Sequence, residues 1–93
     1  MIKGFRCRET ERLFYTGTSR RIPPDLVRRA LGQLRDLDAA AVLDDLRVPP
    51  GRRLEALSGD RAGQHSIRIN QQWRVCFVWQ DGNAHDVEIV DYH

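Results

Sequence analysis

The sequence lacks the marks of a membrane or secreted protein. No apolar run approaches the roughly 18 residues that a transmembrane helix needs, and the N-terminal stretch "MIKGFRCRE" contains no apolar core typical of a signal peptide. The only cysteines, Cys7 and Cys76, are too few and too far apart for a disulfide framework or a zinc site. We therefore expect a cytoplasmic protein with two reduced thiols.

Patterns that hold metals or nucleotide phosphates are missing too. The histidines His65, His85 and His93 do not have the spacing of metal ligands, and neither a Gly-rich phosphate loop nor a Ser/His/Asp arrangement can be recognised. We therefore expect no cofactor and no metal. Any chemistry would be acid/base work by side chains.

Lysine is almost absent, because 14 of the 15 basic residues are arginine. Residues 1–80 hold all the basic residues and nine of the 13 acidic ones, whereas residues 81–93 hold the other four acids and no base. The planar guanidinium of arginine binds phosphate at two points and stacks on bases, which favours RNA or an acidic partner. A GC-rich coding sequence with a solvated surface explains the same bias equally well.

The 93 residues, 41% of them hydrophobic, suit one domain spanning residues 1–93, and its first half is predicted to be mainly helical. A short strand is expected over residues 1–6, and a helix over 9–17 that stops at Gly17. A second helix, over residues 23–38, carries an apolar stripe at steps of three and four. Asp38 is expected to cap a further short helix over residues 39–46.

From residue 52 the apolar period changes to two, which indicates strands. We expect strands over residues 52–57, 65–70, 73–79 and 84–90, with glycine-containing turns at 58–63 and 80–83. Helices followed by a meander predict an α+β fold, with N-terminal helices packed on one face of a small, mainly antiparallel sheet.

Strand parity predicts which residues lie opposite the helices. If Ile67 and Val75 point toward the helices, then Arg68, Arg74 and Tyr92 share the other face. We expect this face to be an open surface. Asp91 has the inner parity, but it lies at the edge of the last strand.

Such a set suits RNA cleavage by the 2′-hydroxyl of the RNA itself, which needs a base, cations for the phosphorane and an acid for the 5′ oxygen. His93 would carry the proton, since its unperturbed pKa is about 6.5. Arg74 and Arg68 would hold the phosphate charge, Tyr92 would stack a base or assist proton transfer, and Asp91 would orient the imidazole or position Tyr92. Each residue also has an ordinary interpretation: an unstructured chain end, a solvated arginine, or a tyrosine that covers the sheet edge.

The stretch "RLEALSGDRAGQHSIRINQQWRVCFVW" and the ending "VEIVDYH" resemble the HigB toxins of the RelE superfamily, and within them the GraT-like branch, over the whole chain. The resemblance implies a RelE-like fold and a ribosome-dependent mRNA endonuclease, an mRNA interferase that inhibits translation. It also implies silencing by a helix-turn-helix antitoxin, HigA, with which the toxin would repress its own promoter. Carried over by position, the catalytic residues implied by the resemblance are Arg74, Asp91, Tyr92 and His93.

Two positions depart from that pattern. Many HigB-like toxins carry a lysine where this chain has Ser58, and some carry a histidine where it has Glu55. A non-catalytic RNA- or ribosome-binding module of the same fold is therefore the alternative, and a protein whose acidic tail and helices serve only protein partners is a third. For RNA or ribosome binding we predict four arginines: Arg20, Arg21, Arg61 and Arg68.

Overall fold

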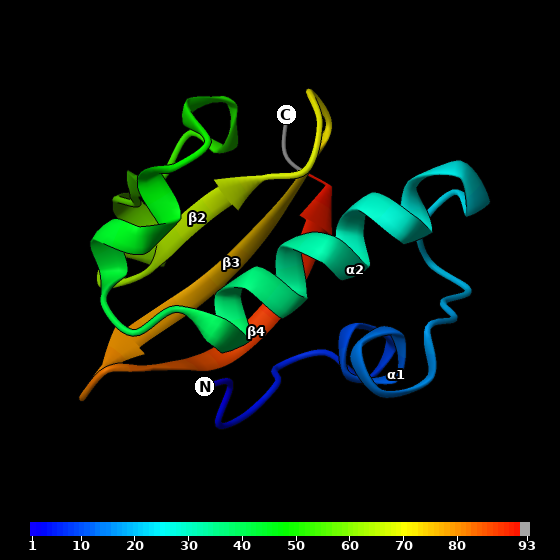
Figure 1. Ribbon diagram of the computed structural model, residues 1–93, viewed down its shortest axis with the longest axis horizontal. Helices are drawn as coiled ribbons and strands as arrows, with labels where there is room; N and C mark the ends of the chain where they lie inside the picture. Colours follow the sequence, from blue (N-terminus) through cyan, green and yellow to red (C-terminus); the bar gives the residue numbers. More distant parts are fainter. Residues whose placement is uncertain (92–93) are drawn as a thin grey trace.

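The computed structural model describes residues 1–91 as two α-helices packed against a four-stranded sheet (Figure 1). The helices are α1 (Arg8–Thr16) and α2 (Pro24–Ala39), and the strands are β1 (Glu55–Ala56), β2 (His65–Arg68), β3 (Trp73–Gln80) and β4 (Asn83–Asp91). Three short 3-10 helices accompany them: η1 (Leu43–Arg47), η2 (Pro50–Arg52) and η3 (Gly59–Arg61). All neighbouring strands are antiparallel, in the order β1-β2-β3-β4. The predicted α+β fold is confirmed.

The two α-helices form close to where the sequence predicts them. Gly17 ends α1 in the left-handed region with φ 76°, and its N–H donates to the carbonyl of Leu13 at 2.8 Å. The stripe of α2 buries Ala30, Leu34 and Leu37, while its three arginines, Arg28, Arg29 and Arg35, are exposed. Burial of this stripe against the sheet fixes the orientation of α2.

The predicted role of Asp38 as a helix cap is wrong. The helix continues to Ala39, and a carboxylate oxygen of Asp38 accepts a hydrogen bond of 2.8 Å from the backbone N–H of Ile2. The short helix that follows is η1, and Asp45 stabilises its start by accepting from the N–H groups of Ala41 and Val42.

The N-terminal segment runs beside β4, but it is not the regular strand that the sequence predicts. Isolated parallel bridges join Ile2 to Ala84 and Phe5 to Val87. The segment therefore pairs with β4 along the side opposite β3, and it covers part of the sheet edge (Figure 1).

The hairpin between β3 and β4 turns through Asp81 and Gly82, with φ of 54° and 76°. Two residues at positive φ match the twist of the flanking strands, which is why Asp-Gly is favoured there. Farther along β4, an irregularity in the register between Cys76 and Val78 adds one residue to β4, near Asp86 at φ 52°. Beyond this bulge, Val87 and Ile89 face the helices as predicted.

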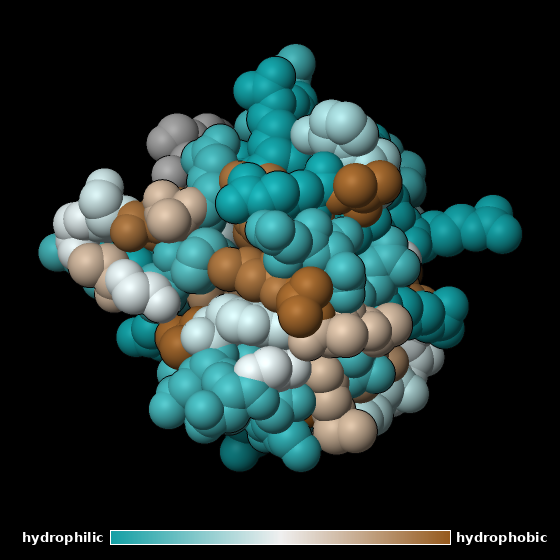
Figure 2. Space-filling view, turned by 60° about the vertical axis from the view of Figure 1, so that its left-hand side comes forward, coloured by the Kyte–Doolittle hydropathy of each residue, from teal (hydrophilic) through white to brown (hydrophobic). Residues whose placement is uncertain are grey.

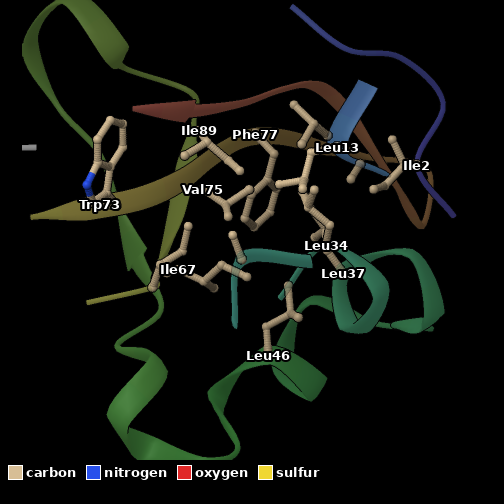
Figure 3. Close-up of a cluster of buried hydrophobic side chains, with 14 of the residues drawn as sticks. Ile2, Leu13, Leu34, Leu37, Leu46, Ile67, Trp73, Val75, Phe77 and Ile89 are labelled. Atoms are coloured by element: carbon tan, nitrogen blue, oxygen red, sulfur yellow. The ribbon is translucent and has the colours of Figure 1, made fainter. Parts of the chain in front are cut away.

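The core lies between the helices and one face of the sheet (Figure 3). Trp73 lies at one end of this cluster and Ile2 at the other, with Phe77 and Val75 between them. The inward parity expected from the sequence is confirmed, because the following residues are fully buried: Ile67, Ile69, Val75 and Phe77. The face seen in Figure 2 is mainly hydrophilic, and apolar side chains are exposed on it only in small groups.

Candidate functional site

The end of β2, the start of β3 and the end of β4 meet at one end of the sheet (Figure 1). A pocket of about 340 Å³ opens at this end, where β2 turns into β3. Every residue that lines it is polar, and three are arginines: Arg53, Arg68, Asn70, Gln71 and Arg74. Three guanidinium groups around one pocket favour an anionic ligand, and phosphate in particular.

Arg74 is held in a fixed orientation within this pocket. Its side chain is 9% exposed, its Nε donates to Ser66 Oγ at 2.8 Å, and its Nη2 donates to the carbonyl of Arg53 at 2.7 Å. A carboxylate oxygen of Glu55 lies 3.7 Å from Nη1. These hydrogen bonds within the protein already fix the orientation of the guanidinium, so ligand binding does not have to order it.

The expectation of an open sheet face is wrong for Arg74. The turn after β1 folds across this face, where Arg61 Nη1 donates to Glu88 on β4 at 2.8 Å and to Gln64 at 3.0 Å. Cys76 is completely buried on the same face, and this burial raises the pKa of its thiol. Strand parity identified the face correctly, but this turn covers part of it, and Arg74 is buried rather than open.

Arg68 and Asp91 lie at the same end of the sheet as Arg74. Arg68 is half-buried and stands directly opposite Arg74 in the register of β2 and β3. Asp91 pairs with Trp73, and its carboxylate accepts a hydrogen bond of 3.1 Å from Gln72. The structure thus places Arg68 and Arg74 together at the pocket, and Asp91 at the same end of the sheet but with the face parity of the core residue Trp73. Tyr92 and His93 lie outside the described residues.

The other predicted RNA-binding arginines are not part of the pocket lining. Arg20 and Arg21 are exposed in the loop between α1 and α2, where the N–H of Arg20 donates to Glu9 and Arg21 Nη1 lies 3.4 Å from Cys7 Sγ. Arg61 is half-buried and paired with Glu88. The predicted binding residues therefore lie in three places: Arg68 at the pocket, Arg61 on the turn after β1, and Arg20 with Arg21 in the loop between the helices.

The thiol of Cys7 differs from that of Cys76. Partial burial would raise the pKa of Cys7, but hydrogen bonds with the backbone and side chain of Thr10, the backbone of Glu9 and the side chain of Arg21 lower it overall. Cys7 is half-buried and Cys76 is buried, and both are free thiols, as expected.

Four contributors to the pocket escaped the sequence analysis. Ser66 could have been found, because it shares the strand parity of Arg68 and Arg74. Asn70 has the same parity within the predicted strand 65–70, whereas Gln71 lies in the turn between β2 and β3, where no local pattern marks it as ligand-facing. Arg53 adopts a left-handed backbone conformation with φ 48°, and this conformation cannot be predicted from an arginine in the sequence.

Residues 1–91 contain neither a cluster of metal ligands nor a helix that could span a membrane. Within this range, no group of three or more His, Cys, Asp or Glu residues is placed to hold a metal ion. No helix in the same range has the length and apolar character needed to cross a membrane.

Comparison with known proteins identifies relatives over the whole chain. Residues 3–93 match the family model described as the RelE-like toxin of type II toxin–antitoxin system HigB. Toxin HigB-1 of Vibrio cholerae is 41% identical over 85 residues, which are 90% of each chain. Endoribonuclease HigB of Proteus vulgaris is 32% identical over 93 residues, the full length of both.

Solved structures support the fold. The chain matches a toxin in the heterotetrameric YoeB-YefM toxin–antitoxin complex from Staphylococcus aureus with a TM-score of 0.60 and 14% identity, covering 100% of this chain and 98% of the other. At this identity the similarity concerns the fold alone.

Proposed function

Because the chain belongs to the HigB-like family of RelE-like toxins of type II toxin–antitoxin systems, we propose that this endoribonuclease toxin cleaves mRNA on the ribosome. The observation that carries the proposal is the buried Arg74 guanidinium, oriented by Ser66 and the carbonyl of Arg53 in a pocket of three arginines. A fixed cation in such a pocket stabilises the extra negative charge of a phosphorane.

The proposed reaction uses the RNA as its own nucleophile. A base removes the proton from the 2′-hydroxyl, the 2′ oxygen bonds to phosphorus, and the bond from phosphorus to the 5′ oxygen breaks as an acid protonates that oxygen. The products are a 2′,3′-cyclic phosphate and a 5′-hydroxyl. Since each proton moves between the RNA and a side chain, the proposed reaction needs no cofactor.

The proposed catalytic residues are Arg74, Asp91, Tyr92 and His93. Asp91 ends β4 beside the start of β3, and two further residues extend a chain by at most about 7 Å. This connection supports a site in which His93 exchanges protons with the RNA and Tyr92 stacks on a base or assists. Asp91 would orient the imidazole of His93 or position Tyr92.

Binding is proposed to involve two regions of the surface. Arg68 lines the pocket beside Arg74, and it would contact the phosphates next to the cleaved bond. Arg20 and Arg21 would contact ribosomal RNA from the loop between the helices. Arg61 has a smaller expected part, because Glu88 already neutralises much of its charge.

The proposed protein partner is an antitoxin. This partner follows from the type II toxin–antitoxin family and from the antitoxin YefM in the structural relative. We propose a helix-turn-helix antitoxin of the HigA kind, encoded beside the toxin gene, that blocks the toxin and represses their shared promoter together with it.

A non-catalytic RNA- or ribosome-binding module is the second candidate. The observation that favours it is Glu55, whose carboxylate stands 3.7 Å from Arg74 and competes with phosphate for that guanidinium. Ser58 on the adjacent exposed turn adds no cation. Such a module would occupy the ribosome without cutting mRNA.

Primer extension on cellular mRNA after induction separates the two candidates. We expect the wild-type chain to create new 5′ ends inside translated regions, Arg74→Ala to create none, and Arg74→Lys to act partly because ammonium lacks the two-point contact. The matched control is Arg29→Ala on the exposed face of α2, which should cut like the wild type.

Each alternative outcome has a defined meaning. Cutting of an mRNA without a ribosome-binding site would contradict ribosome dependence. Slowed translation and co-sedimentation with ribosomes, without new 5′ ends, would identify the binding module. Full cutting by a folded Arg74→Ala variant would remove Arg74 from the site.

A further inference from the structure

We propose that the side chain of Arg53 binds an RNA phosphate next to the one held by Arg74, an inference that rests on the proposed function. Arg53 lies two residues before the short strand β1, and no sequence motif marks it as a binding residue. The structure brings it to the pocket that Arg68 and Arg74 line.

The backbone of Arg53 is unusual for a residue with a side chain. It ends η2 with φ 48° and ψ 63°, in the left-handed region, where its N–H donates to the carbonyl of Pro50 at 3.1 Å. Glycine adopts this conformation readily, whereas a Cβ atom makes it unfavourable. Non-glycine residues in this region cluster at functional sites, so an arginine here suggests that its side chain has a use.

This conformation also orients the carbonyl of Arg53. The carbonyl accepts the hydrogen bond of 2.7 Å from Arg74 Nη2. One residue therefore fixes the guanidinium of Arg74 through its main chain and places its own guanidinium at the same pocket. The side chain of Arg53 therefore starts from the backbone that holds the Arg74 guanidinium.

Within residues 1–91, the guanidinium of Arg53 has no acceptor, in contrast to those of Arg52 and Arg47. Arg52 donates to Asp36 at 2.6 Å, and Arg47 donates to Asp44 at 2.8 Å. Within residues 1–91, the exposed side chain of Arg53 makes no hydrogen bond or ion pair. Its charge and its fork of donors remain available to an external anion.

A polynucleotide is the ligand that this arrangement fits. Arg74 is fixed and mostly buried, which suits the phosphate that reacts. Arg53 is exposed and has no partner within residues 1–91, which suits a flanking phosphate of the same strand. Single-stranded RNA presents phosphates at regular intervals, so neighbouring arginines engage successive ones.

Three variants test the inference. Arg53→Gly keeps the backbone conformation and the carbonyl that holds Arg74, but removes the side chain. Arg53→Lys keeps the charge without the two-point fork. Arg47→Ala removes one surface charge outside the pocket, where Arg47 pairs with Asp44 at 64% side-chain exposure. Thermal unfolding of each variant verifies that the fold is kept.

Binding is measured by fluorescence anisotropy with a labelled single-stranded 2′-O-methyl RNA oligomer, which cannot be cleaved, between about 50 and 200 mM salt. We expect Arg53→Gly to weaken binding roughly tenfold and to reduce the salt slope by about 0.7, the value for one phosphate contact on a single strand. Arg53→Lys should restore the slope and only part of the affinity. Arg47→Ala should resemble the wild type.

A salt slope of Arg53→Gly equal to that of the wild type, while Arg74→Ala lowers it, would overturn the inference. A wild-type chain that does not bind the oligomer would overturn it as well. Failure of the proposed function is a separate outcome: the wild type binds the oligomer with the expected slope and loses affinity in Arg53→Gly, but cuts no mRNA on the ribosome.

Discussion

The Nε atom of Arg74 donates a hydrogen bond of 2.8 Å to the Oγ atom of Ser66, and both residues are buried. Ser66 lies on β2 and Arg74 on β3, so the bond crosses between neighbouring strands. A buried charge is stable only when its donors have partners. Ser66 therefore serves the charged residue at the centre of the site.

Replacing Ser66 with alanine should lower the free energy of unfolding by about 1.5–3 kcal/mol, because Nε of Arg74 would lose its acceptor in a buried position. The midpoint of urea or thermal unfolding measures this loss. A double-mutant cycle with Arg74→Ala gives the control: in that background Ser66→Ala should have a much smaller effect. Equal effects in both backgrounds would mean that the bond adds nothing to stability.

Glu55 gives a second prediction, because its carboxylate lies 3.7 Å from Nη1 of Arg74 and is half-exposed. Exposed ion pairs contribute at most about 1 kcal/mol, so Glu55→Gln should raise RNA affinity by up to about fivefold. Cleavage on programmed ribosomes should not fall, since His93 is the proposed proton carrier. A fall of about 100-fold with unchanged binding would assign the base to Glu55 instead.

The fold could be predicted because its signals are local. The stripe through Leu34 and Leu37, the alternation of Val75 and Phe77, and the Asp81-Gly82 turn each depend on a few neighbouring residues. Strand parity also placed Arg68 and Arg74 on one face. What parity cannot tell is how far that face is covered.

The covering of the site depends on contacts between residues distant in sequence. Arg61 and Glu88 are 27 positions apart, and their ion pair holds the turn after β1 over the sheet. Arg53 meets Arg74 across 21 positions through a backbone conformation that its residue type disfavours. Neither contact produces a periodic pattern in the sequence. The prediction from the sequence therefore placed Arg74 on an open face and did not include Arg53 in the site.

A third prediction concerns the two residues that follow Asp91. Deleting Tyr92 and His93 leaves β4 and its buried Val87 and Ile89 intact, so the thermal midpoint should move by only a few degrees, which corresponds to about 1 kcal/mol. Cleavage should fall by roughly 10² to 10⁴ if His93 carries the proton, and His93→Ala alone should reproduce this loss. Ribosome co-sedimentation should persist.

The outcome of that deletion separates two roles of the chain end. A truncated protein that still cuts mRNA would exclude His93 as the proton carrier. A truncated protein that fails to fold would identify the last residues as part of the structure, and His93→Ala would then decide whether the imidazole has a chemical role.

The loop arginines allow binding to the ribosome to be separated from cleavage. Arg20 and Arg21 are exposed beside the start of α1 and do not line the pocket, so the double variant Arg20→Ala/Arg21→Ala should leave Arg74 and its contacts unchanged. Each lost phosphate contact reduces the salt slope of binding by about 0.7–0.9. Co-sedimentation across a salt series should therefore show weaker binding and a slope smaller by about one to two.

The cleavage rate at saturating toxin distinguishes this loop from the pocket. If Arg20 and Arg21 only hold the toxin on the ribosome, the rate for bound toxin should equal that of the wild type, because binding lost equally from ground and transition states does not change the chemical step. The matched control is Arg28→Ala/Arg29→Ala, which removes the same charge from the exposed face of α2. If the control lowers the salt slope as much as the loop variant does, the effect reflects net charge, and the loop has no specific contact with the ribosome.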